Sequence, residues 1–278
     1  MKKRLLSVLI AGCLLTGIFT ACGNKEKEVS QETAEDVSLD YILEKKTLVL
    51  GLDTSFPPMG FIDSQQKIVG FDIDVAKEVA NELGVELVLQ PISWEAKELE
   101  LAAKNIDCIW NGMTVNEDRK ANMSLSDSYM ENKQVVVVLA DSSIEILTDL
   151  AGKNVVIQSG STAQDAVEGN KELLDSLGSL IKVEDNIKAM LDLKIKSSDA
   201  VVMDEVVARY YTSIEANEGQ YRILEETLSD EEYAIGFRKG ELVLTEEVNE
   251  ILSKMAVDGR LEKISNEWFD TDVTVINK

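Results

Sequence analysis

The feature that most constrains the fold of this chain is a regular alternation of strand-like and helix-like segments after residue 40. The aliphatic run 47–52 predicts a strand, and residues 71–84 repeat apolar side chains at helical spacing before a terminal glycine. The segments 85–89, 94–104 and 106–111 then predict a strand, a helix and a third strand. Consecutive β-α-β units of this kind predict a mostly parallel sheet with right-handed crossovers.

A second α/β block begins with the valine-rich run 134–139, which is apolar enough for a strand buried on both faces. Beyond it the pattern predicts strands at 155–158, 200–203, 221–224 and 233–237 and helices at 162–177, 185–196, 206–217, 241–257 and 260–268. Two such blocks predict two lobes, and ligands bind at the carboxyl ends of strands in open α/β sheets. In the helix at 94–104 we expect Leu99, Ala102 and Ala103 to face the core.

Composition excludes whole classes of function. The 278 residues include no histidine, which removes the commonest general base and the commonest ligand for transition metals. This disfavours zinc hydrolases and Ser-His-Asp hydrolases, and it leaves open chemistry carried out by carboxylates. The 28 basic and 51 acidic residues give a formal charge of -23, so a nucleic-acid partner is not expected. We expect neither a metal ion nor a cofactor.

The N-terminus has the composition of a bacterial lipoprotein signal. Residues 2–4 are all basic, and the apolar segment 5–20 is too short for a comfortable membrane span. Small residues then precede Cys22, an order that resembles a lipobox, in which the cysteine is acylated (palmitate) and begins the mature chain. We therefore predict a signal peptide at 1–21 and a flexible, polar tether at 22–39.

The alternatives at the N-terminus are an ordinary secretory signal and an uncleaved anchor. A lipid on Cys22 would hold the protein at the extracytoplasmic face of the cell membrane without spanning it. No second apolar run of 18 residues follows, so we expect membrane attachment through the lipid anchor only. Of the other cysteines, Cys13 lies in the signal, and Cys108 alternates with Ile106 and Trp110, which predicts an inert, buried strand residue.

A candidate binding stretch follows the strand predicted at 106–111. Gly112 comes directly after this strand, Thr114 follows it, and Arg119 lies five residues further on. The glycine permits a close approach to the backbone and leaves amides, a hydroxyl and a guanidinium near one point. A guanidinium can grip a carboxylate with two parallel charge-assisted bonds, so the pattern suits a small carboxylate ligand. The alternative is a surface loop whose arginine forms an ordinary ion pair.

Several motifs occur in a fixed order along the two blocks. The most specific is Gly70-Phe71-Asp72-Ile73-Asp74-Val75 followed by Val79-Ala80. The others are Gly51-x-Asp53, Gly112-Met113-Thr114 with Arg119, Ser126-x-x-Tyr129, Asp149-Leu150-x-Gly152-Lys153, the 158–162 turn, Asp199-Ala200-Val201 before Asp204, and Trp268-Phe269. With these motifs the chain resembles the family 3 solute-binding proteins, the polar amino-acid receptors of ABC importers, over roughly residues 40–270.

The resemblance implies an α/β, two-lobed, periplasmic-binding-protein-like (type II) fold with two hinge strands and a ligand cleft between the lobes. Lobe 1 would comprise residues 40–132 plus 234–278, and lobe 2 would comprise residues 133–233. The chain would cross from one lobe to the other near residues 131–136 and return near residues 231–235.

The resemblance also implies a clamp for a zwitterion. Arg119 should grip the α-carboxylate of the ligand, assisted by Thr114 and by backbone amides around Gly112 and Thr162. Asp204 should accept the α-ammonium group, although an aspartate between a strand and a helix can also serve as an N-cap. Because these charged partners come from different lobes, their bonds to the ligand would be complete only in a closed cleft.

Four further residues fall where the family reads the side chain of the ligand. The resemblance places Phe56 and Trp94 as stacking aromatic rings and Asp53 and Gln158 around the head group. The residues themselves leave two alternatives open, which are core packing for both aromatic rings and a turn cap for Asp53. Departures from the family pattern, such as Met59 after the two prolines, leave a cationic ligand, an amide ligand and cystine open.

The function implied is that of an extracytoplasmic receptor, expected to be a monomer, that captures a polar amino acid or cystine by lobe closure. Its protein partner would be the permease of an ABC importer. One alternative is a dehydratase-type enzyme on the same fold, with Glu95, Asp53 or Glu131 as a general acid, although nothing in the sequence indicates paired carboxylates. Another alternative is a ligand-sensing protein. We expect a binding protein and not an enzyme.

Overall fold

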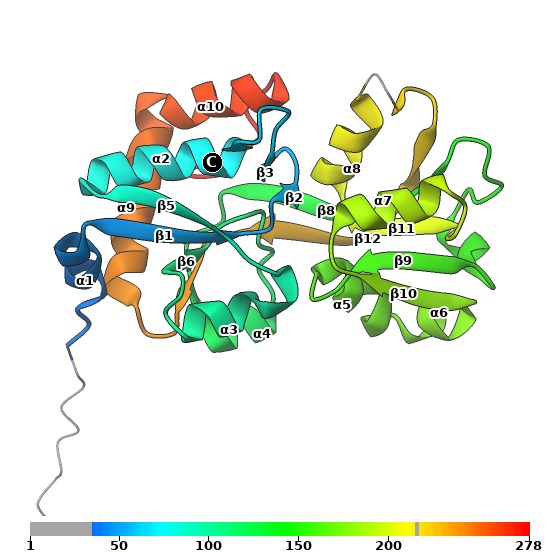
Figure 1. Cartoon of the computed structure of the whole chain (residues 1–278), viewed down its shortest axis with the longest axis horizontal. Coiled ribbons are helices and arrows are strands. Elements are labelled where there is room, and N and C mark those ends of the chain that lie inside the picture. The colour runs from blue at the N-terminus through cyan, green and yellow to red at the C-terminus, as the bar shows by residue number, and fades with distance from the viewer. Residues whose placement is uncertain (1–34, 215–216) are drawn as a thin grey trace, which may run out of the picture. The chain divides into compact units, whose positions relative to one another are not determined.

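Two five-stranded sheets organise the part of the chain that the structure, a computed structural model, describes, namely residues 35–214 and 217–278 (Figure 1). The helices are α1 (Ser38–Lys45), α2 (Phe71–Leu83), α3 (Lys97–Ala102), α4 (Glu117–Asn122), α5 (Thr162–Gly169), α6 (Lys171–Ser176), α7 (Asn186–Lys194), α8 (Glu205–Ser213), α9 (Leu242–Asp258) and α10 (Arg260–Phe269), with short 3-10 turns η1 (Trp94–Ala96) and η2 (Leu147–Leu150). The strands are β1 (Thr47–Leu52), β2 (Ser55–Phe56), β3 (Gly60–Ile62), β4 (Ile68–Val69), β5 (Glu86–Pro91), β6 (Cys108–Ile109), β7 (Met123–Leu125), β8 (Met130–Leu139), β9 (Asn154–Gln158), β10 (Ser179–Val183), β11 (Ala200–Asp204), β12 (Tyr221–Tyr233) and β13 (Gly236–Arg238).

The first sheet defines lobe 1 and has the strand order β5-β1-β6-β13-β7. Strand β1 is parallel to β5 and β6, as the β-α-β pattern predicted, and β13 is antiparallel to β6 and β7. Helices α2 and α10 lie on one side of this sheet, and α3 and α4 lie on the other (Figure 1). A small sheet of β2, β3 and β4 follows β1 and lies at the side of lobe 1 that faces lobe 2 (Figure 1).

The second sheet defines lobe 2 and has the strand order β10-β9-β11-β8-β12. Strand β9 is parallel to β10 and β11, whereas β8 is antiparallel to both β11 and β12. Helices α7 and α8 lie on one side of this sheet, and α5 and α6 lie on the other (Figure 1). Both lobes therefore have helices on both sides of a central sheet, and the predicted α/β, two-lobed fold is confirmed.

Two long strands, β8 and β12, link the lobes. They pair antiparallel from Met130 opposite Tyr233 to Leu139 opposite Tyr221, with register shifts between residues 223 and 229. Their lobe 1 ends also bridge to other segments of that lobe, because Tyr233 pairs with Thr114 and Met130 pairs with Thr274. The sequence pattern predicted two separate strands here and missed the polar segment 225–232, whose backbone pairing with β8 does not depend on apolar side chains.

Helix α2 follows the prediction closely and shows how glycines fix its ends. It ends at Leu83, and Gly84 caps it in the left-handed conformation with φ 70°. Gly70 precedes the helix with φ 147°, and a Cβ atom there would lie 2.1 Å from the carbonyl oxygen of Met59. A side chain at position 70 is therefore excluded both by the backbone conformation and by the space around it.

The orientation predicted for the segment 94–104 is wrong. Leu99 is 70% exposed, and Ala102 and Ala103 are also exposed, whereas Lys97 and Leu101 are buried. The segment opens with the 3-10 turn η1, and only its central part, α3, is α-helical, so a single 3.6-residue period does not describe it. This change of phase turns a lysine toward the interior of the protein.

The prediction of a buried strand residue holds for the cysteine of β6. Cys108 is fully buried, as predicted, and burial raises the pKa of its thiol, which disfavours the reactive thiolate. None of the described helices has the length and apolar character needed to cross a membrane. The predicted signal peptide at 1–21 and the predicted lipidation site, Cys22, lie outside the described residues. Helix α1 begins at Ser38, inside the segment 22–39 predicted as a tether.

Candidate functional site

Side chains and backbone groups of the two lobes meet directly between the sheets. Gln158 Nε2 of lobe 2 donates to Asp53 Oδ2 of lobe 1 over 2.6 Å. Thr162 Oγ1 lies 3.1 Å from Thr114 Oγ1, also across the junction. The structure therefore brings together, in one closed arrangement, residues that the sequence predicted to share a ligand site.

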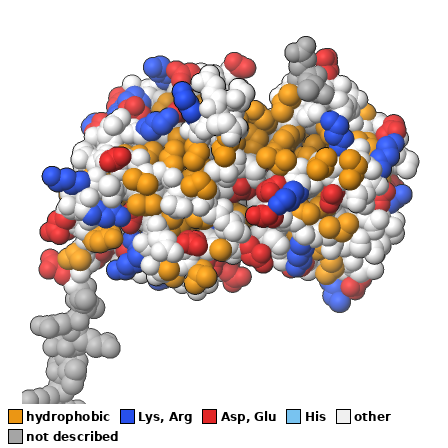
Figure 2. Space-filling model, viewed as in Figure 1, with side chains coloured by type: hydrophobic (Ala, Val, Ile, Leu, Met, Phe, Trp, Pro, Cys, Tyr) orange, Lys and Arg blue, Asp and Glu red, His pale blue; other side chains and the backbone are white. Residues whose placement is uncertain are grey.

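Aromatic side chains also cross the junction. Phe61 of β3 and Tyr210 of α8 have ring centroids 5.5 Å apart, and Phe61 also lies 6.0 Å from Trp268. They line a crevice of about 770 Å³ that includes the exposed Ile62 and Ile187. Figure 2 shows hydrophobic side chains gathered on this face of the molecule where the two lobes meet. The closed arrangement thus has apolar as well as polar contacts between the lobes.

The turn after β6 requires glycine. Gly112 has φ 59°, and a Cβ atom there would lie 2.7 Å from Cε1 of Phe56. Its backbone N–H donates to Asp72 Oδ2 over 2.7 Å. A left-handed backbone and an aromatic ring packed against it together exclude other residues at this position.

Asp72 is a supporting residue whose role the sequence pattern did not reveal. In the sequence it was only one residue of the motif after Gly70, but its side chain is fully buried and accepts from Gly112 N and, over 3.0 Å, from Tyr129 Oη. Burial raises the pKa of Asp72 to about 7, against the effect of these hydrogen bonds. Its position seven residues before the buried Val79, on the apolar face of α2, was the available signal.

Arg119 is a buried cation without an anionic partner. It lies on the short helix α4, whose N-cap Asn116 accepts from Arg119 N over 2.8 Å, and it is only 4% exposed. Its guanidinium donates to the carbonyl of Thr114 over 2.6 Å, and no carboxylate of the described residues lies within 4.0 Å of it. Burial lowers the pKa of Arg119. The alternative of a surface arginine in an ordinary ion pair is therefore wrong. We call Gly112, Thr114 and Arg119 the carboxylate grip, after the role that the sequence predicts for them.

Asp204 is buried at the end of β11. It occupies the N-cap position of α8, but its side chain makes no capping bond. Its Oδ1 instead accepts from Asn132 Nδ2 and Gln134 Nε2, each over 2.6 Å. Burial, followed by the nearby charge of Glu231, raises the pKa of Asp204 to about 7. The side chain therefore faces the junction of the lobes, and the N-cap alternative is wrong for this carboxylate.

Glu231 of β12 was not among the predicted site residues. Its Oε2 accepts from Thr114 Oγ1 over 2.8 Å and from Thr162 Oγ1 over 3.2 Å, so one oxygen contacts both lobes. The same oxygen accepts from Gln134 Nε2 over 2.9 Å and from Asn132 Nδ2 over 3.1 Å. We call Asp204 and Glu231 the acid pair.

Asp53 and Gln158 form a second polar cluster. Asp53 Oδ1 accepts from the backbone N–H and hydroxyl of Ser55, over 2.9 and 2.6 Å, so the predicted turn cap is present. Its Oδ2 accepts from Gln158, whose Nε2 also donates to the carbonyl of Glu184. Burial raises the pKa of Asp53. One carboxylate thus both caps a turn and contacts the opposite lobe.

The two predicted stacking aromatics, Phe56 and Trp94, are 6% and 7% exposed, respectively, and pack in the cores of lobe 1. The buried Lys97, which was not among the residues predicted to face the core, has its Nζ 5.1 Å from the Trp94 ring centroid. Its Nζ donates to the carbonyls of Gly160, over 2.9 Å across the junction, and of Trp94, over 3.3 Å. Burial, followed by the charge of Arg119, lowers the pKa of Lys97 to about 8.

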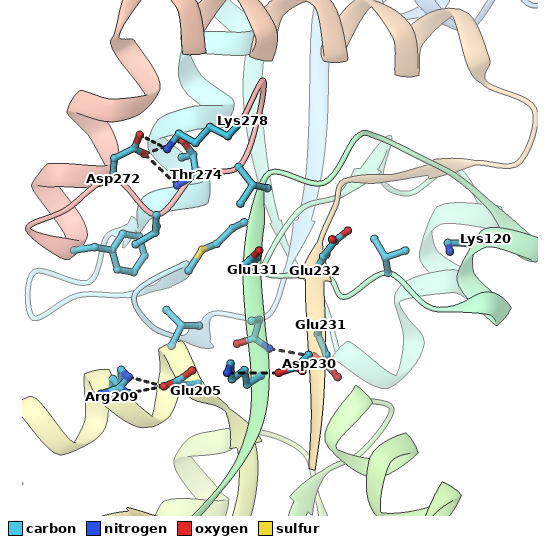
Figure 3. Close-up of a pocket in the computed structure, with 18 residues that line it drawn as sticks. Lys120, Glu131, Glu205, Arg209, Asp230, Glu231, Glu232, Asp272, Thr274 and Lys278 are labelled. Atoms are coloured by element: carbon cyan, nitrogen blue, oxygen red, sulfur yellow. Dashed lines mark hydrogen bonds and ion pairs between the residues drawn. The ribbon is translucent and has the colours of Figure 1, made fainter. Parts of the chain in front are cut away.

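A groove of about 1080 Å³ runs beside the crossing strands β8 and β12 (Figure 3). Glu231 is among its lining residues, but none of the nine residues predicted to bind ligand is. Its charges are largely paired with one another, as in Lys133–Asp230 and Lys278–Asp272. The groove therefore adjoins the acid pair at Glu231, but its lining includes neither the carboxylate grip nor the Asp53 cluster.

The acids weighed for catalysis do not form one centre. Asp53 is bonded to Ser55 and Gln158, Glu95 is exposed, and Glu131 is exposed and lines the groove beside the hinge strands. In the described part of the chain, no group of three or more Cys, His, Asp or Glu side chains is arranged to hold a metal ion.

Known proteins resemble this chain in sequence and in structure. Residues 48–271 match the family described as bacterial extracellular solute-binding proteins, family 3. The arginine-binding extracellular protein ArtP of Bacillus subtilis is 33% identical over 272 residues, which cover 97% of this chain and 98% of that protein. The L-cystine-binding protein TcyJ of Escherichia coli is 28% identical over 243 residues, 87% of this chain and 89% of that protein.

A solved structure is similar over most of its length. The substrate-binding protein of an ABC uptake transporter from Streptococcus pneumoniae, with bound histidine, superposes with a TM-score of 0.84 at 34% identity. The match covers 87% of this chain and 100% of that chain. The TM-score indicates the same fold, and the sequence identity indicates that the two proteins are also related in sequence.

Proposed function

This chain belongs to the bacterial extracellular solute-binding proteins of family 3, and we propose that it captures a polar amino acid or cystine between its lobes for delivery to an ABC importer. Relatives named as arginine-, cystine- and glutamine-binding proteins support this class of ligand. The protein partner would be the importer's permease, and the chain would act as a monomer.

The observation that carries the proposal is a basic and an acidic side chain at the lobe junction, neither of which has an ion-pair partner in the part of the chain that the structure describes. Arg119 has no carboxylate within 4.0 Å among the described residues, and Asp204 has no lysine or arginine nitrogen within that distance. A free amino acid carries both missing partners at a fixed separation. Each charge-assisted bond that it forms contributes roughly 1.5–3 kcal/mol.

Lobe closure would follow from where these groups are attached. Arg119 and Thr114 belong to lobe 1, whereas Asp204 and Thr162 belong to lobe 2. A ligand that bonds to both sets favours the closed state by its differential affinity for that state. The long strands β8 and β12 would serve as the hinge.

The charge of the site favours some amino acids over others. Asp53, Asp204 and Glu231 face the lobe junction, against two cations, Arg119 and Lys97. This excess of acids should repel a ligand with a second, uncompensated carboxylate such as glutamate. Neutral and cationic amino acids and cystine, whose charges balance, are compatible with it.

We also propose that the chain is a lipid-anchored binding protein and not an enzyme. The separation of Asp53, Glu95 and Glu131 supports a binding role, because no two of them share a hydrogen bond in the described part of the chain. Attachment would depend on Cys22. Replacement of Cys22 with serine should release the protein from the membrane fraction, and continued membrane attachment would contradict the anchor.

Thermal unfolding with a panel of ligands tests the proposed function. We expect at least one of the twenty amino acids or cystine to raise the unfolding midpoint, because a ligand that binds only the native state stabilises it by mass action. Glutamate and aspartate should give the smallest shifts. A panel without any shift would contradict the receptor function, and turnover of a prephenate-like acid would favour the dehydratase alternative.

A further inference from the structure

We propose that Glu231 is a second acceptor for the α-ammonium group of the ligand and that, with Asp204, it selects α-amino acids over acids that lack this group. The inference rests on the proposed function, because it presupposes that an amino acid binds at the lobe junction. It assigns a specificity role to a residue of the hinge strand β12, next to β8 in Figure 3.

Two amide groups hold the acid pair together. Asn132 Nδ2 donates to Asp204 Oδ1 over 2.6 Å and to Glu231 Oε2 over 3.1 Å. Gln134 Nε2 donates to the same two oxygens over 2.6 and 2.9 Å. One oxygen of each carboxylate is therefore held close to the other by two shared donors. We infer that one further donor group can contact both carboxylates, as each of the two amide groups does.

The acid pair has no cation. Among the described residues, no lysine or arginine nitrogen lies within 4.0 Å of Asp204 or Glu231. Asp204 is 6% exposed, so water does little to reduce the repulsion between the two carboxylates. Two neighbouring carboxylates, of which Asp204 is buried and Glu231 half-buried, are stabilised by a cation that bridges them. An ammonium group supplies one positive charge and three N–H donors.

Two unpartnered oxygens point to the same kind of ligand. Asn132 Oδ1 and Gln134 Oε1 are buried and accept no hydrogen bond from any described residue. The residues are 5% and 0% exposed, and buried polar atoms in native proteins nearly always have a partner. The site therefore combines two carboxylates and two free amide oxygens, which are all acceptors. A ligand rich in N–H donors satisfies this set, and an anion does not.

A competing role for Glu231 is that of a tethered substitute for the ligand's carboxylate. Thr114 Oγ1 and Thr162 Oγ1, which were predicted to hold that carboxylate, both donate to Glu231 Oε2. The guanidinium of Arg119, however, forms no ion pair with Glu231 within 4.0 Å. The guanidinium of the carboxylate grip therefore remains available to pair with the carboxylate of the ligand. The two roles predict opposite changes in ligand affinity when Glu231 is replaced. Removal of a tethered competitor would tighten binding, whereas removal of an ammonium acceptor would weaken it.

The attachment of Glu231 couples ammonium recognition to closure. Its oxygen accepts from Thr114 of lobe 1 and Thr162 of lobe 2, so the complete set of bonds exists only when the lobes meet. Opening removes at least one donor and separates Glu231 from one lobe. The second ammonium acceptor would thus be fully positioned only in the closed state.

The test replaces Glu231 with glutamine, which keeps the size of the side chain and removes its charge. We expect E231Q to bind its best ligand among L-arginine, L-glutamine and L-histidine roughly 10- to 100-fold more weakly than the wild type. The matched control is E232Q, because Glu232 is the next residue of β12, is exposed and bonds to Ser128 Oγ outside the proposed site. Equal or tighter binding by E231Q would overturn the inference.

A second measurement separates recognition of the ammonium group from a general effect on the hinge. The same titrations use the desamino counterparts 5-guanidinopentanoate, glutaramate and imidazolepropionate, for which E231Q should bind no more weakly than the wild type. An equal loss for both ligand types would assign Glu231 a hinge role and overturn the proposal. A crystal structure of the complex with the α-nitrogen bonded to Asp204 alone would also overturn it. A wild type that binds no amino acid would instead contradict the proposed function.

Discussion

The carboxylate grip and the acid pair are built in different ways. Gly112, Thr114 and Arg119 follow one another along a single turn and the start of a short helix. Asp204 and Glu231 come from different strands, β11 and β12, which are joined through amide side chains of β8 between them. The grip therefore depends on local backbone conformation, whereas the acid pair depends on how the lobe 2 sheet pairs. Mutations in the carboxylate grip and in the acid pair should therefore affect ligand binding in different ways.

The difference extends to the surroundings of each charge. The grip has a buried support, because Asp72 bonds to both the Gly112 turn and Tyr129. In the acid pair, Glu231 lies on β12, one of the two strands that link the lobes, and its bonds to Thr114 and Thr162 change when the lobes open. A rigid support at the carboxylate grip and a movable one at the acid pair suit the proposed function. The ligand's carboxylate would bind to the grip first, and its ammonium group would bind to the acid pair on closure.

The largest expected effect comes from removing the cation of the grip. Arg119→Ala should lower the affinity for every amino-acid ligand by about a hundred-fold or more, because two charge-assisted bonds to the carboxylate are lost. The thermal shift given by each ligand should disappear. Arg209→Ala is the matched control, since Arg209 is exposed and pairs with Glu205 at the surface. Unchanged binding by Arg119→Ala would refute the assignment of the grip.

The next effect concerns the support of the grip and should appear in stability. Asp72→Ala leaves the Gly112 N–H and the Tyr129 hydroxyl buried without an acceptor, which should lower the free energy of unfolding by about 2–4 kcal/mol. Asp72→Asn keeps a carbonyl oxygen and should cost less than half as much. Chemical denaturation of both variants gives the comparison. Equal losses would show that the shape of the residue matters more than its acceptor.

Ligand binding by the acid pair should depend on pH near neutrality, whereas binding by the carboxylate grip should not. The pKa of Asp204 is raised to about 7, so below that value a proton competes with the ligand's ammonium group. Arg119 and Tyr233 also face Asp204, but the first stays protonated and burial raises the pKa of the second, so neither titrates between pH 6 and 8. Calorimetry should give roughly tenfold weaker binding at pH 6 than at pH 8.

The same pKa shifts predict the opposite trend for the ligand-free protein. Asp72 and Asp204 keep their protons up to about pH 7 in the folded state, whereas their usual pKa is 3.8. Their contribution to stability is therefore fully present below about pH 4 and is lost as pH rises to 7. Asp204→Asn should flatten the pH dependence of the denaturant midpoint over this range. Identical slopes for the variant and the wild type would contradict the shift.

The smallest effect should come from the cross-lobe lysine. Lys97→Met removes the bond from Nζ to the Gly160 carbonyl but keeps a long unbranched side chain. Ligand binding should weaken by roughly 3- to 10-fold, because one bond of the closed state is lost while the cost of burying an unpaired cation is relieved. Lys104→Met, on the exposed end of the same segment, is the control. Unchanged affinity would show that the bond does not contribute to closure.

Elements with strong local signals could be predicted from the sequence. The aliphatic run of β1 and the glycine-bounded periodicity of α2 were placed within one residue of their ends. The same reasoning failed at 94–104, where a 3-10 turn shifts the phase and buries Lys97. It also failed at 225–232, where a polar segment becomes a strand because β8 offers it backbone partners.

The residues of the candidate site also differ in whether a local sequence signal reveals them. Gly112, Thr114 and Arg119 could be recognised because a positive-φ turn, a hydroxyl and a guanidinium follow one another in the sequence. Glu231 could not, since it is one acid among many in a polar stretch and acquires its role only from the pairing of β12 with β8. Asp72 lay between these cases, as an acid on an apolar helix face.

The sequence by itself determined the α/β class, the two lobes and the local geometry of the carboxylate grip, because periodicity, glycines and caps act between residues a few positions apart. Only the tertiary structure decided that Arg119 is buried without an anion and that Asp204 and Glu231 share two amide donors. Burial and the pairing of charges depend on which strands and lobes meet, and no local pattern encodes those contacts.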